Sequence, residues 1–313
     1  MRILFMGTPD FALFSLRALV EAGENIIGVI TQPDKPKGRG YTLTPPPVKI
    51  YAEEQGIPVL QPNSLRGEEF AATLAELDPD LIAVVAYGKI LPQNVLDYPK
   101  YGCINVHGSL LPEYRGAAPM QRAIIDGKRE TGITTQMMND GIDTGDILLM
   151  EKIEIAANDN FETVHDKLGA LGASVLLRTI NAVRNGTLTR TEQDHALATH
   201  AAKIEKEDCM IDFSRSAQAV HDQIRGLSPI PLAFTHTPDG KMLKIVASEV
   251  SKTEASALPG TVLSLADGKI TVACGTGAIS LLSVLPEGKK RMASADFING
   301  RKINAGDLLT TRK

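Results

Sequence analysis

Asn105 and His107 lie two residues apart in the stretch CINVHGSLLP, and both are of types that stabilise developing charge or move protons. If this stretch is a β-strand, the two side chains point to the same face of the sheet, with Cα atoms about 6.6 Å apart. An Asn amide can donate to an oxygen that becomes negative, and a His can carry a proton at neutral pH. An alternative of equal weight at this point is that His107 caps the strand end structurally and Asn105 serves a turn.

A second polar cluster, NDGIDTGD at residues 139–146, follows further along the chain. Asp and Gly dominate turns, so a surface turn is one interpretation, whereas the ligand spacing of a calcium loop is absent. Asp143 follows the apolar Ile142 and could point inward, where a carboxylate would hold an imidazole in one tautomer. Asn, His and Asp together favour acyl or formyl transfer to an amine, because the amine attacks directly without a side-chain nucleophile. Cys103 has the same strand parity as Asn105, but we predict that it is a packing residue.

The first half of the chain alternates signals for strands and helices. Short apolar runs predict strands at 3–6, 26–31, 81–86 and 103–107. Helical spacing of apolar residues covers 10–23, 48–55 and 67–77. The run LIAVVA at 81–86 is typical of a strand that is buried on both faces of a parallel sheet. The alternation predicts a doubly wound, Rossmann-like α/β domain, which binds ligands beyond the carboxyl ends of its strands, where His107 stands.

The pattern changes in the second half of the chain. A long helix is predicted at 161–183, and a polar stretch with weak apolar periodicity follows it. After a further predicted helix at 216–225, strands dominate, at 243–250, 260–265, 269–273 and 278–284. Several short strands separated by turn residues predict a small β-barrel or sandwich. We therefore expect a catalytic domain at 1–188, a linker at 189–206 and a smaller C-terminal domain at 207–313.

Several functional classes are disfavoured by the sequence. The first strand-to-helix turn at 7–10 lacks the G-x-G-x-x-G of a dinucleotide site, and Pro9 removes a backbone donor where phosphate would be held. The three cysteines, Cys103, Cys209 and Cys274, form no C-x-x-C motif, which argues against a zinc site and fits a reducing compartment. No apolar stretch is long enough to span a bilayer, so we expect a cytoplasmic protein with no membrane partner.

Five segments together resemble the folate-dependent formyltransferase family over essentially the whole chain: MRILFMGTPDFA, TQPDKPKGRG, VVAYGKILP, INVHGSLLPEYRGAAPMQRAI and GIDTGD. The pairing of INVHGSLLP with a later GIDTGD is highly specific to that family, and the segment TQPDKPKGRG is similar to its branch that formylates methionyl-tRNA. The resemblance implies transfer of a formyl group from 10-formyltetrahydrofolate to the α-amine of methionine on initiator tRNA, for translation initiation. It implies neither a metal nor a nicotinamide cofactor.

The resemblance also implies roles for particular residues. The catalytic set is Asn105, His107 and Asp143. The folate-contacting residues are Ser109, Leu110, Leu111 and Pro112, with Tyr87 and Gly88 in the segment YGKILP. The exposed, irregular loop 33–40 would engage the acceptor end of tRNA through Lys35, Lys37 and Arg39. The C-terminal β module resembles the family's OB-like barrel, a fold that commonly binds nucleic acid.

The net charge of −4 averages over unlike parts of the chain. Residues 207–313 hold 13 Lys and Arg against 11 Asp and Glu, whereas residues 1–206 hold 20 against 26, so the negative total does not exclude tRNA. One alternative is a relative that acts on a sugar nucleotide or hydrolyses formyltetrahydrofolate, which would have no use for the basic loop. Another is a nucleic-acid-binding protein with a vestigial Rossmann-like domain, against which the intact Asn–His–Asp set argues. We expect a monomer.

Overall fold

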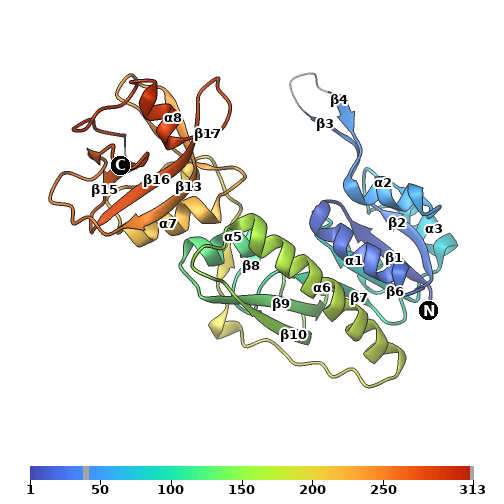
Figure 1. Cartoon of the computed structure of the whole chain (residues 1–313). Coiled ribbons are helices and arrows are strands. Elements are labelled where there is room, and N and C mark those ends of the chain that lie inside the picture. The colour runs from blue at the N-terminus through green and yellow to red at the C-terminus, as the bar shows by residue number, and fades with distance from the viewer. Residues whose placement is uncertain (38–41, 311–313) are drawn as a thin grey trace. The chain divides into compact units, whose positions relative to one another are not determined.

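The computed structural model describes residues 1–37 and 42–310, and these form two compact units (Figure 1). The first unit comprises Met1–Gly116, Thr131–Ile153 and His165–His200. The second comprises Ala117–Glu130, Glu154–Val164 and Ala201–Lys313. Each unit is therefore assembled from segments that are separated in sequence. The domain boundaries at 188 and 206 stay a prediction.

A seven-stranded sheet forms the centre of the first unit. Its strands are β1 (Ile3–Gly7), β2 (Ile26–Ile30), β5 (Val59–Leu60), β6 (Leu81–Val85), β7 (Cys103–His107), β9 (Glu130–Met137) and β10 (Ile147–Glu154). Their order in the sheet is β10-β9-β7-β6-β1-β2-β5. β1, β2, β5, β6 and β7 are parallel, and β9 joins β7 in antiparallel orientation. The predicted Rossmann-like fold is confirmed, with a mixed sheet.

The sequence patterns of the strands and helices agree with this architecture. All five residues of β1 and of β6 are buried, as continuous apolar runs predict for central parallel strands. The helices are α1 (Asp10–Glu21), α2 (Pro47–Glu54), α3 (Glu68–Leu77), α4 (Gln93–Leu96) and α6 (Phe161–Arg184). Two glycines let α6 approach its neighbours closely: a Cβ on Gly169 would lie 2.5 Å from Phe14 of α1, and one on Gly172 would lie 3.1 Å from Val106 of β7.

The loop predicted to be irregular contains a short hairpin. Strand β3 (Lys35–Lys37) pairs antiparallel with β4 (Thr42–Thr44), with Lys35 opposite Thr44. At the base of the hairpin, Lys49 of α2 donates to both carboxylate oxygens of Asp34, at 3.1 and 3.0 Å. Lys49 and Gln61 hydrogen-bond to each other and both bond Asp34, which lowers the pKa of Asp34, most strongly through Gln61. The hairpin therefore projects from an anchored base (Figure 1).

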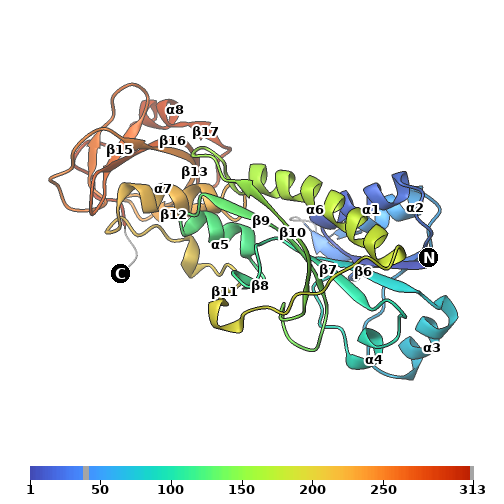
Figure 2. The same ribbon diagram turned by 90° about the horizontal axis from the view of Figure 1, so that it is seen from below.

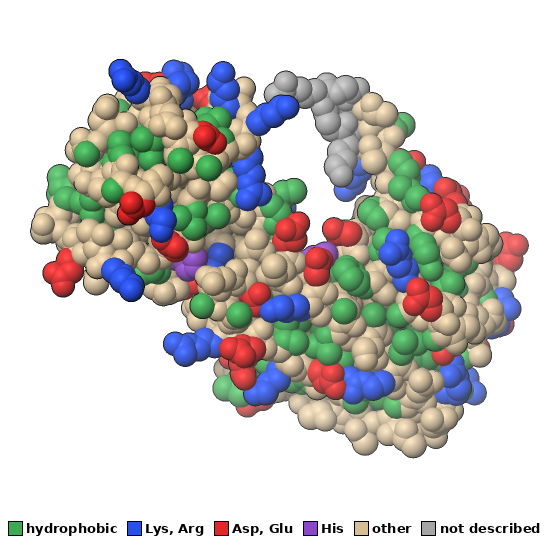
Figure 3. All heavy atoms as spheres, viewed as in Figure 1, with side chains coloured by type: hydrophobic (Ala, Val, Ile, Leu, Met, Phe, Trp, Pro, Cys, Tyr) green, Lys and Arg blue, Asp and Glu red, His purple; other side chains and the backbone are tan. Residues whose placement is uncertain are grey.

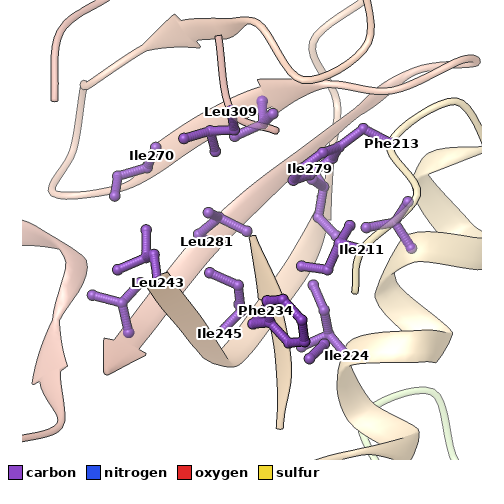
Figure 4. Packing of buried hydrophobic residues seen from close by; sticks show 14 of the residues in the cluster. Ile211, Phe213, Ile224, Phe234, Leu243, Ile245, Ile270, Ile279, Leu281 and Leu309 are labelled. Carbon is purple, nitrogen blue, oxygen red and sulfur yellow. The ribbon is translucent and has the colours of Figure 1, made fainter. Parts of the chain in front are cut away.

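The second unit contains a six-stranded sheet packed on helices. Its strands run β12 (Ala233–His236), β13 (Met242–Ser251), β16 (Ala278–Pro286), β15 (Ile270–Ala273) and β14 (Val262–Ser264), with β17 (Met292–Ala293) on β16. Its helices are α5 (Pro119–Ile125), α7 (Ala217–Gly226) and α8 (Ser294–Asn299). All the pairings are antiparallel, and the sheet curls as a half-barrel, which confirms the OB-like expectation. Apolar residues of β13, β15, β16 and α7 meet in its core (Figure 4).

Short elements complete the chain. The two-residue strands β8 (Arg115–Gly116) and β11 (His200–Ala201) lie where the chain passes from the first unit to the second. Single-turn 3-10 helices cover His195–Leu197 and Glu207–Cys209. Figure 2 shows α6 running beside β9 and β10, as it also does in Figure 1. Within 1–37 and 42–310, no helix combines the length and the apolar character needed to cross a membrane.

Candidate functional site

Asn105, His107 and Asp143 meet at the carboxyl edge of the first unit's sheet. Asn105 Nδ2 lies 3.4 Å from Asp143 Oδ1, and His107 Nδ1 lies 3.5 Å from the same oxygen. Asn105 and His107 come from β7, as their spacing predicted, and Asp143 comes from the loop that joins β9 to β10. His107 is only 6% exposed. The structure therefore brings the predicted catalytic set together in a largely buried place.

Shorter hydrogen bonds than these hold the Asp143 carboxylate. Gln136 Nε2 donates to Oδ1 at 2.8 Å, and the backbone N–H of Gly116 donates to Oδ2 at 2.9 Å. Gln136 stands directly opposite Asn105 in the pairing of β9 with β7, so both side chains leave the same face of the sheet. The longer contact to Asn105 exceeds the usual 2.7–3.2 Å range, which leaves the Asn105 amide free to serve another acceptor.

The hydrogen bonds of His107 fix the position of its proton when the ring is neutral. Nε2 lies 2.9 Å from the carbonyl oxygen of Tyr114, and a carbonyl can only accept, so Nε2 carries the proton. Nδ1 then holds a lone pair and faces the Asp143 carboxylate. A proton arriving at Nδ1 would convert this contact into an ion pair. The arrangement suits a histidine that accepts a proton during the reaction.

Cys103 is the other residue of β7 with this parity. It is 1% exposed, and burial raises the pKa of its thiol to about 12. Its Sγ lies 3.6 Å from the carbonyl oxygen of Val95. At neutral pH the group is an unreactive thiol inside the core, in agreement with the packing role predicted for it.

The residues predicted to contact folate divide into two groups by burial. The side chains of Tyr87, Ser109 and Leu111 are buried, at 2%, 0% and 3% exposure. Ser109 Oγ donates to the carbonyl of Glu113 at 2.6 Å, which fixes the loop after β7. Gly88 is exposed, and Leu110 and Pro112 are half-buried, so these three are able to contact a ligand.

The segments that follow β6 and β7 leave the sheet next to each other. Because the two strands are parallel neighbours, about 4.8 Å apart, the loop that begins at Ala86 and the loop that begins at Gly108 start side by side. Thr134 of β9 ties the second loop down: its Oγ1 donates to the carbonyl of Ser109 at 2.7 Å and accepts from the backbone N–H of Leu111 at 3.1 Å. Together the loops form a fixed edge for a ligand beside Asn105.

A cavity of about 210 Å³ opens near the carboxyl end of β1. The chain runs from β1 to β2 and β5 on one side and returns to β6 and β7 on the other, so the topological switch point lies between β1 and β6. Open α/β sheets bind ligands at such a point. The cavity lies beside it, at the carboxyl ends of β1 and β2, since none of its lining residues follows β6. The cavity is lined by Thr8, Pro9, Gln32, Pro33, Lys35 and Pro36, and by residues 44–47, which lead from the end of β4 into α2. Its volume suits a group the size of one residue, since whole small-molecule ligands fill about 300–1,000 Å³.

The structure describes two of the three basic residues that are predicted to bind tRNA. Lys35 is exposed on β3 and lines the cavity. Lys37 ends the same strand. Arg39 lies outside the described residues. In the second unit, Figure 3 shows Lys and Arg gathered along its upper margin; among its exposed cations are Lys289, Lys290, Arg291, Arg301 and Lys302.

Sequence reasoning missed Gln136, Gln193 and Arg115, which support the site. Gln136 could have been found only from the register of β9 against β7. Gln193 lies 50 residues from the Asp143 carbonyl that it contacts, and no local pattern marks it. Within 1–37 and 42–310, no cluster of three or more His, Cys, Asp or Glu side chains could hold a metal ion.

Comparisons with known proteins give matches along nearly the whole chain. A family described as "Formyl transferase" matches residues 1–180, and "Formyl transferase, C-terminal domain" matches residues 203–302. A methionyl-tRNA formyltransferase of Citrifermentans bemidjiense is 49% identical over 309 residues, covering 99% of this chain and 96% of that protein. One of Bacillus velezensis is 47% identical over 309 residues, covering 98% and 97%.

Solved structures share the fold at much lower identity. WlaRD, a sugar 3N-formyl transferase crystallised with dTDP and 5-N-formyl-THF, superposes with a TM-score of 0.67 at 18% identity, covering 93% of this chain and 99% of that one. HypX from Aquifex aeolicus, in complex with tetrahydrofolic acid, superposes with a TM-score of 0.64 at 17% identity, covering 100% of this chain and 51% of that one. At these identities the likeness concerns the fold.

Proposed function

The chain belongs to the formyl transferase family, and on that premise we propose that it formylates the α-amino group of methionyl-initiator tRNA, with 10-formyltetrahydrofolate as donor. The observation that supports this chemistry is the convergence of Asn105 and His107 on one carboxylate oxygen of Asp143. The relatives that are 47–49% identical over nearly the full length specify the acceptor as methionyl-tRNA. A sugar nucleotide is not favoured, because the sugar-specific neighbour is only 18% identical.

Each residue of the catalytic set has one task in the proposed reaction. Asn105 Nδ2 donates to the formyl oxygen as negative charge develops there, since its contact to Asp143 is long and exchangeable. His107 Nδ1 accepts the proton that the amine releases as it bonds to the formyl carbon, because Nε2 is committed to the carbonyl of Tyr114. The same proton passes to N10 of the folate as the bond from N10 to the formyl carbon breaks, and tetrahydrofolate leaves. Asp143 stabilises the imidazolium that forms, because its Oδ1 then faces a protonated Nδ1.

Residues at the carboxyl edge hold the donor. 10-Formyltetrahydrofolate supplies the formyl group when it is bound. Exposed Gly88 offers its backbone, and Ile90, which is 69% exposed, offers an apolar surface of the kind that a pteridine ring covers. Leu110 and Pro112 are half-buried in the neighbouring loop. The side chains of Tyr87, Ser109 and Leu111 are buried and shape the same two loops from the side of the core.

The β3–β4 hairpin and the C-terminal unit bind the tRNA in this proposal. Lys35 at the cavity, together with Lys37 and Arg39, supplies positive charge for the acceptor end. The cavity near β1 takes the aminoacyl end, which is of the size of one residue. Exposed cations of the C-terminal unit add phosphate contacts, so binding weakens as salt rises.

The direct test is an acceptor assay. The protein is incubated with 10-formyltetrahydrofolate and methionyl-initiator tRNA, and formyl-methionine is measured after hydrolysis of the ester. Parallel reactions contain an amino-sugar nucleotide, or no acceptor, to detect hydrolysis of the donor. Formyl-methionine as the main product supports the proposal. Transfer to the sugar amine or acceptor-independent hydrolysis, with no formyl-methionine, overturns it.

A further inference from the structure

Gln193 is a buried amide that belongs to neither family match. The matches cover residues 1–180 and 203–302, so they leave out the segment that carries it. Its side chain is 3% exposed, although the surrounding segment is polar and mostly exposed. A buried amide must find hydrogen-bond partners, because leaving it unpaired costs free energy.

Both ends of the Gln193 amide are saturated. Nε2 donates to the carbonyl oxygens of Asp143, at 2.9 Å, and Gly145, at 2.6 Å. Oε1 accepts from Nε of Arg115, at 3.1 Å, and from Nη2 of the same guanidinium, at 2.7 Å. A Gln side chain has two donor hydrogens and two acceptor lone pairs, and all four are used here.

The four contacts allow only one orientation of the amide. A flipped amide would set Oε1 against two carbonyl oxygens and Nε2 against a guanidinium that has only donors. Arg115 is in turn fixed by His195, whose Nδ1 accepts from Nη2 at 2.9 Å. Gln193 therefore joins the Asp143 loop to the strand of Arg115 through one defined geometry.

The loop that Gln193 grips needs such support. Asp143 has a φ of 51°, a left-handed backbone conformation that residues other than Gly seldom adopt. Residues in such conformations persist only when surrounding contacts over-determine them. Gly145 packs so tightly that a Cβ there would lie 1.7 Å from the carbonyl oxygen of Met137. The two carbonyls that Gln193 holds flank Thr144, so they fix the backbone directly after the strained residue.

Backbone pairing brings Gln193 to this place. Thr191 and Ile147 exchange two backbone hydrogen bonds, at 2.8 and 2.9 Å, where β10 begins. Further along the segment, the Thr199 hydroxyl accepts from the backbone N–H of Tyr114 at 2.8 Å. The segment thus runs along the site, between these two attachments, and its buried amide faces the loop.

We propose that Gln193 is a positioning residue for formyl transfer: it fixes the backbone of the Asp143 loop so that the carboxylate stays beside His107 and Asn105. The inference rests on the proposed function, since it takes Asp143 as part of the catalytic set. Gln193 acts through Asp143 and does not touch the substrates. Its loss should therefore lower the rate of the chemical step without weakening the binding of either substrate.

The experiment compares Gln193→Met and Gln193→Glu with the wild type in steady-state and single-turnover formylation. Met keeps the length of the side chain but removes all four hydrogen bonds, whereas Glu keeps the acceptors for Arg115 and removes both donors to the loop. We expect kcat to fall about 10- to 100-fold in both variants, because displacements of about 1 Å cost rates of this size. KM for folate and for tRNA should stay within about twofold. Gln93→Met, on an exposed side of α4, is the matched control and should behave as wild type.

A double-mutant cycle with Asp143→Ala tests the route of the effect. If Gln193 acts through Asp143, Gln193→Glu should change the residual single-turnover rate of Asp143→Ala less than about twofold. An equal loss in both backgrounds, or wild-type kcat in both Gln193 variants, would overturn the inference. A fall in kcat that only tracks the folded fraction in thermal unfolding would also overturn it. Wild-type activity of Asp143→Ala alone would instead refute the catalytic role of Asp143 in the proposed function.

Discussion

Replacing Asn105 by Ala should greatly lower activity but hardly change stability, because the Asp143 carboxylate keeps its two shorter hydrogen bonds. The amide contacts Asp143 Oδ1 at 3.4 Å, while Gln136 at 2.8 Å and the N–H of Gly116 at 2.9 Å remain in place. The substitution therefore leaves no buried charge without a partner. We expect the free energy of unfolding to fall by no more than about 1 kcal/mol, the typical net contribution of one hydrogen bond.

The expected loss of activity is much larger. Removing one donor to a developing oxyanion lowers kcat by about 10²- to 10³-fold, or about 2.7–4 kcal/mol of transition-state stabilisation. Because Asn105 is only half-buried and its contact to Asp143 is long, the difference between the two energies reports its action on the formyl oxygen. KM for methionyl-tRNA should change little.

The assay is single-turnover formylation of methionyl-initiator tRNA at saturating 10-formyltetrahydrofolate, with urea unfolding of the same preparations. Asn181→Ala on α6 is the matched control: its side chain is exposed and accepts a hydrogen bond from Arg184. The control should keep the wild-type rate. A rate for Asn105→Ala within about threefold of wild type would refute the oxyanion role. An unfolding loss as large as the activity loss would show a structural role instead.

Three further outcomes are expected. Arg39→Ala should raise KM for tRNA about tenfold and reduce the salt dependence of binding, since the proposed function assigns this cation to the acceptor end of tRNA; an equal loss of folate affinity in equilibrium binding would contradict this. Arg225→Met should lower the free energy of unfolding in urea by about 3–5 kcal/mol, because the partner Asp222, at 2.7 Å, is then buried with an uncompensated charge. A loss below about 1 kcal/mol would contradict this prediction. The Asp10 carboxylate, 3.6 Å from Nε2, raises the pKa of His165 above 6.5 most strongly, and the Asp166 carboxylate, 2.9 Å from Nδ1, raises it further. His165 in turn lowers the pKa of Asp10 below 3.8, so the stabilisation is full between those two values and falls as pH rises through the raised pKa. The difference in the free energy of unfolding between wild type and His165→Gln should therefore shrink from pH 6 to pH 9. A difference that stays constant would refute the pairing.

The local elements of the fold could be predicted from the sequence, because their signals are short-ranged. The short stretch CINVH predicted the strand Cys103–His107, and helical spacing predicted a helix at 161–183, which the structure extends by one residue to Arg184. Parity along one strand also placed Asn105 and His107 on the same face. The hairpin at β3 and β4 was predicted only as an irregular loop, because three-residue strands rich in Lys, Pro and Thr carry no apolar alternation.

The support of the site was decided by tertiary structure alone. Gln136 reaches Asp143 because β9 joins β7 in one register, and a shift of one residue would turn its side chain to the other face. Gln193 contacts Arg115 across 78 residues of sequence, from a polar segment that resembles a solvated linker. By itself, then, the sequence determined which groups could do the chemistry, since that depends on residue type and on spacing along one strand. Which side chains hold those groups in place depends on contacts between segments far apart in the chain, and these leave no periodic signal.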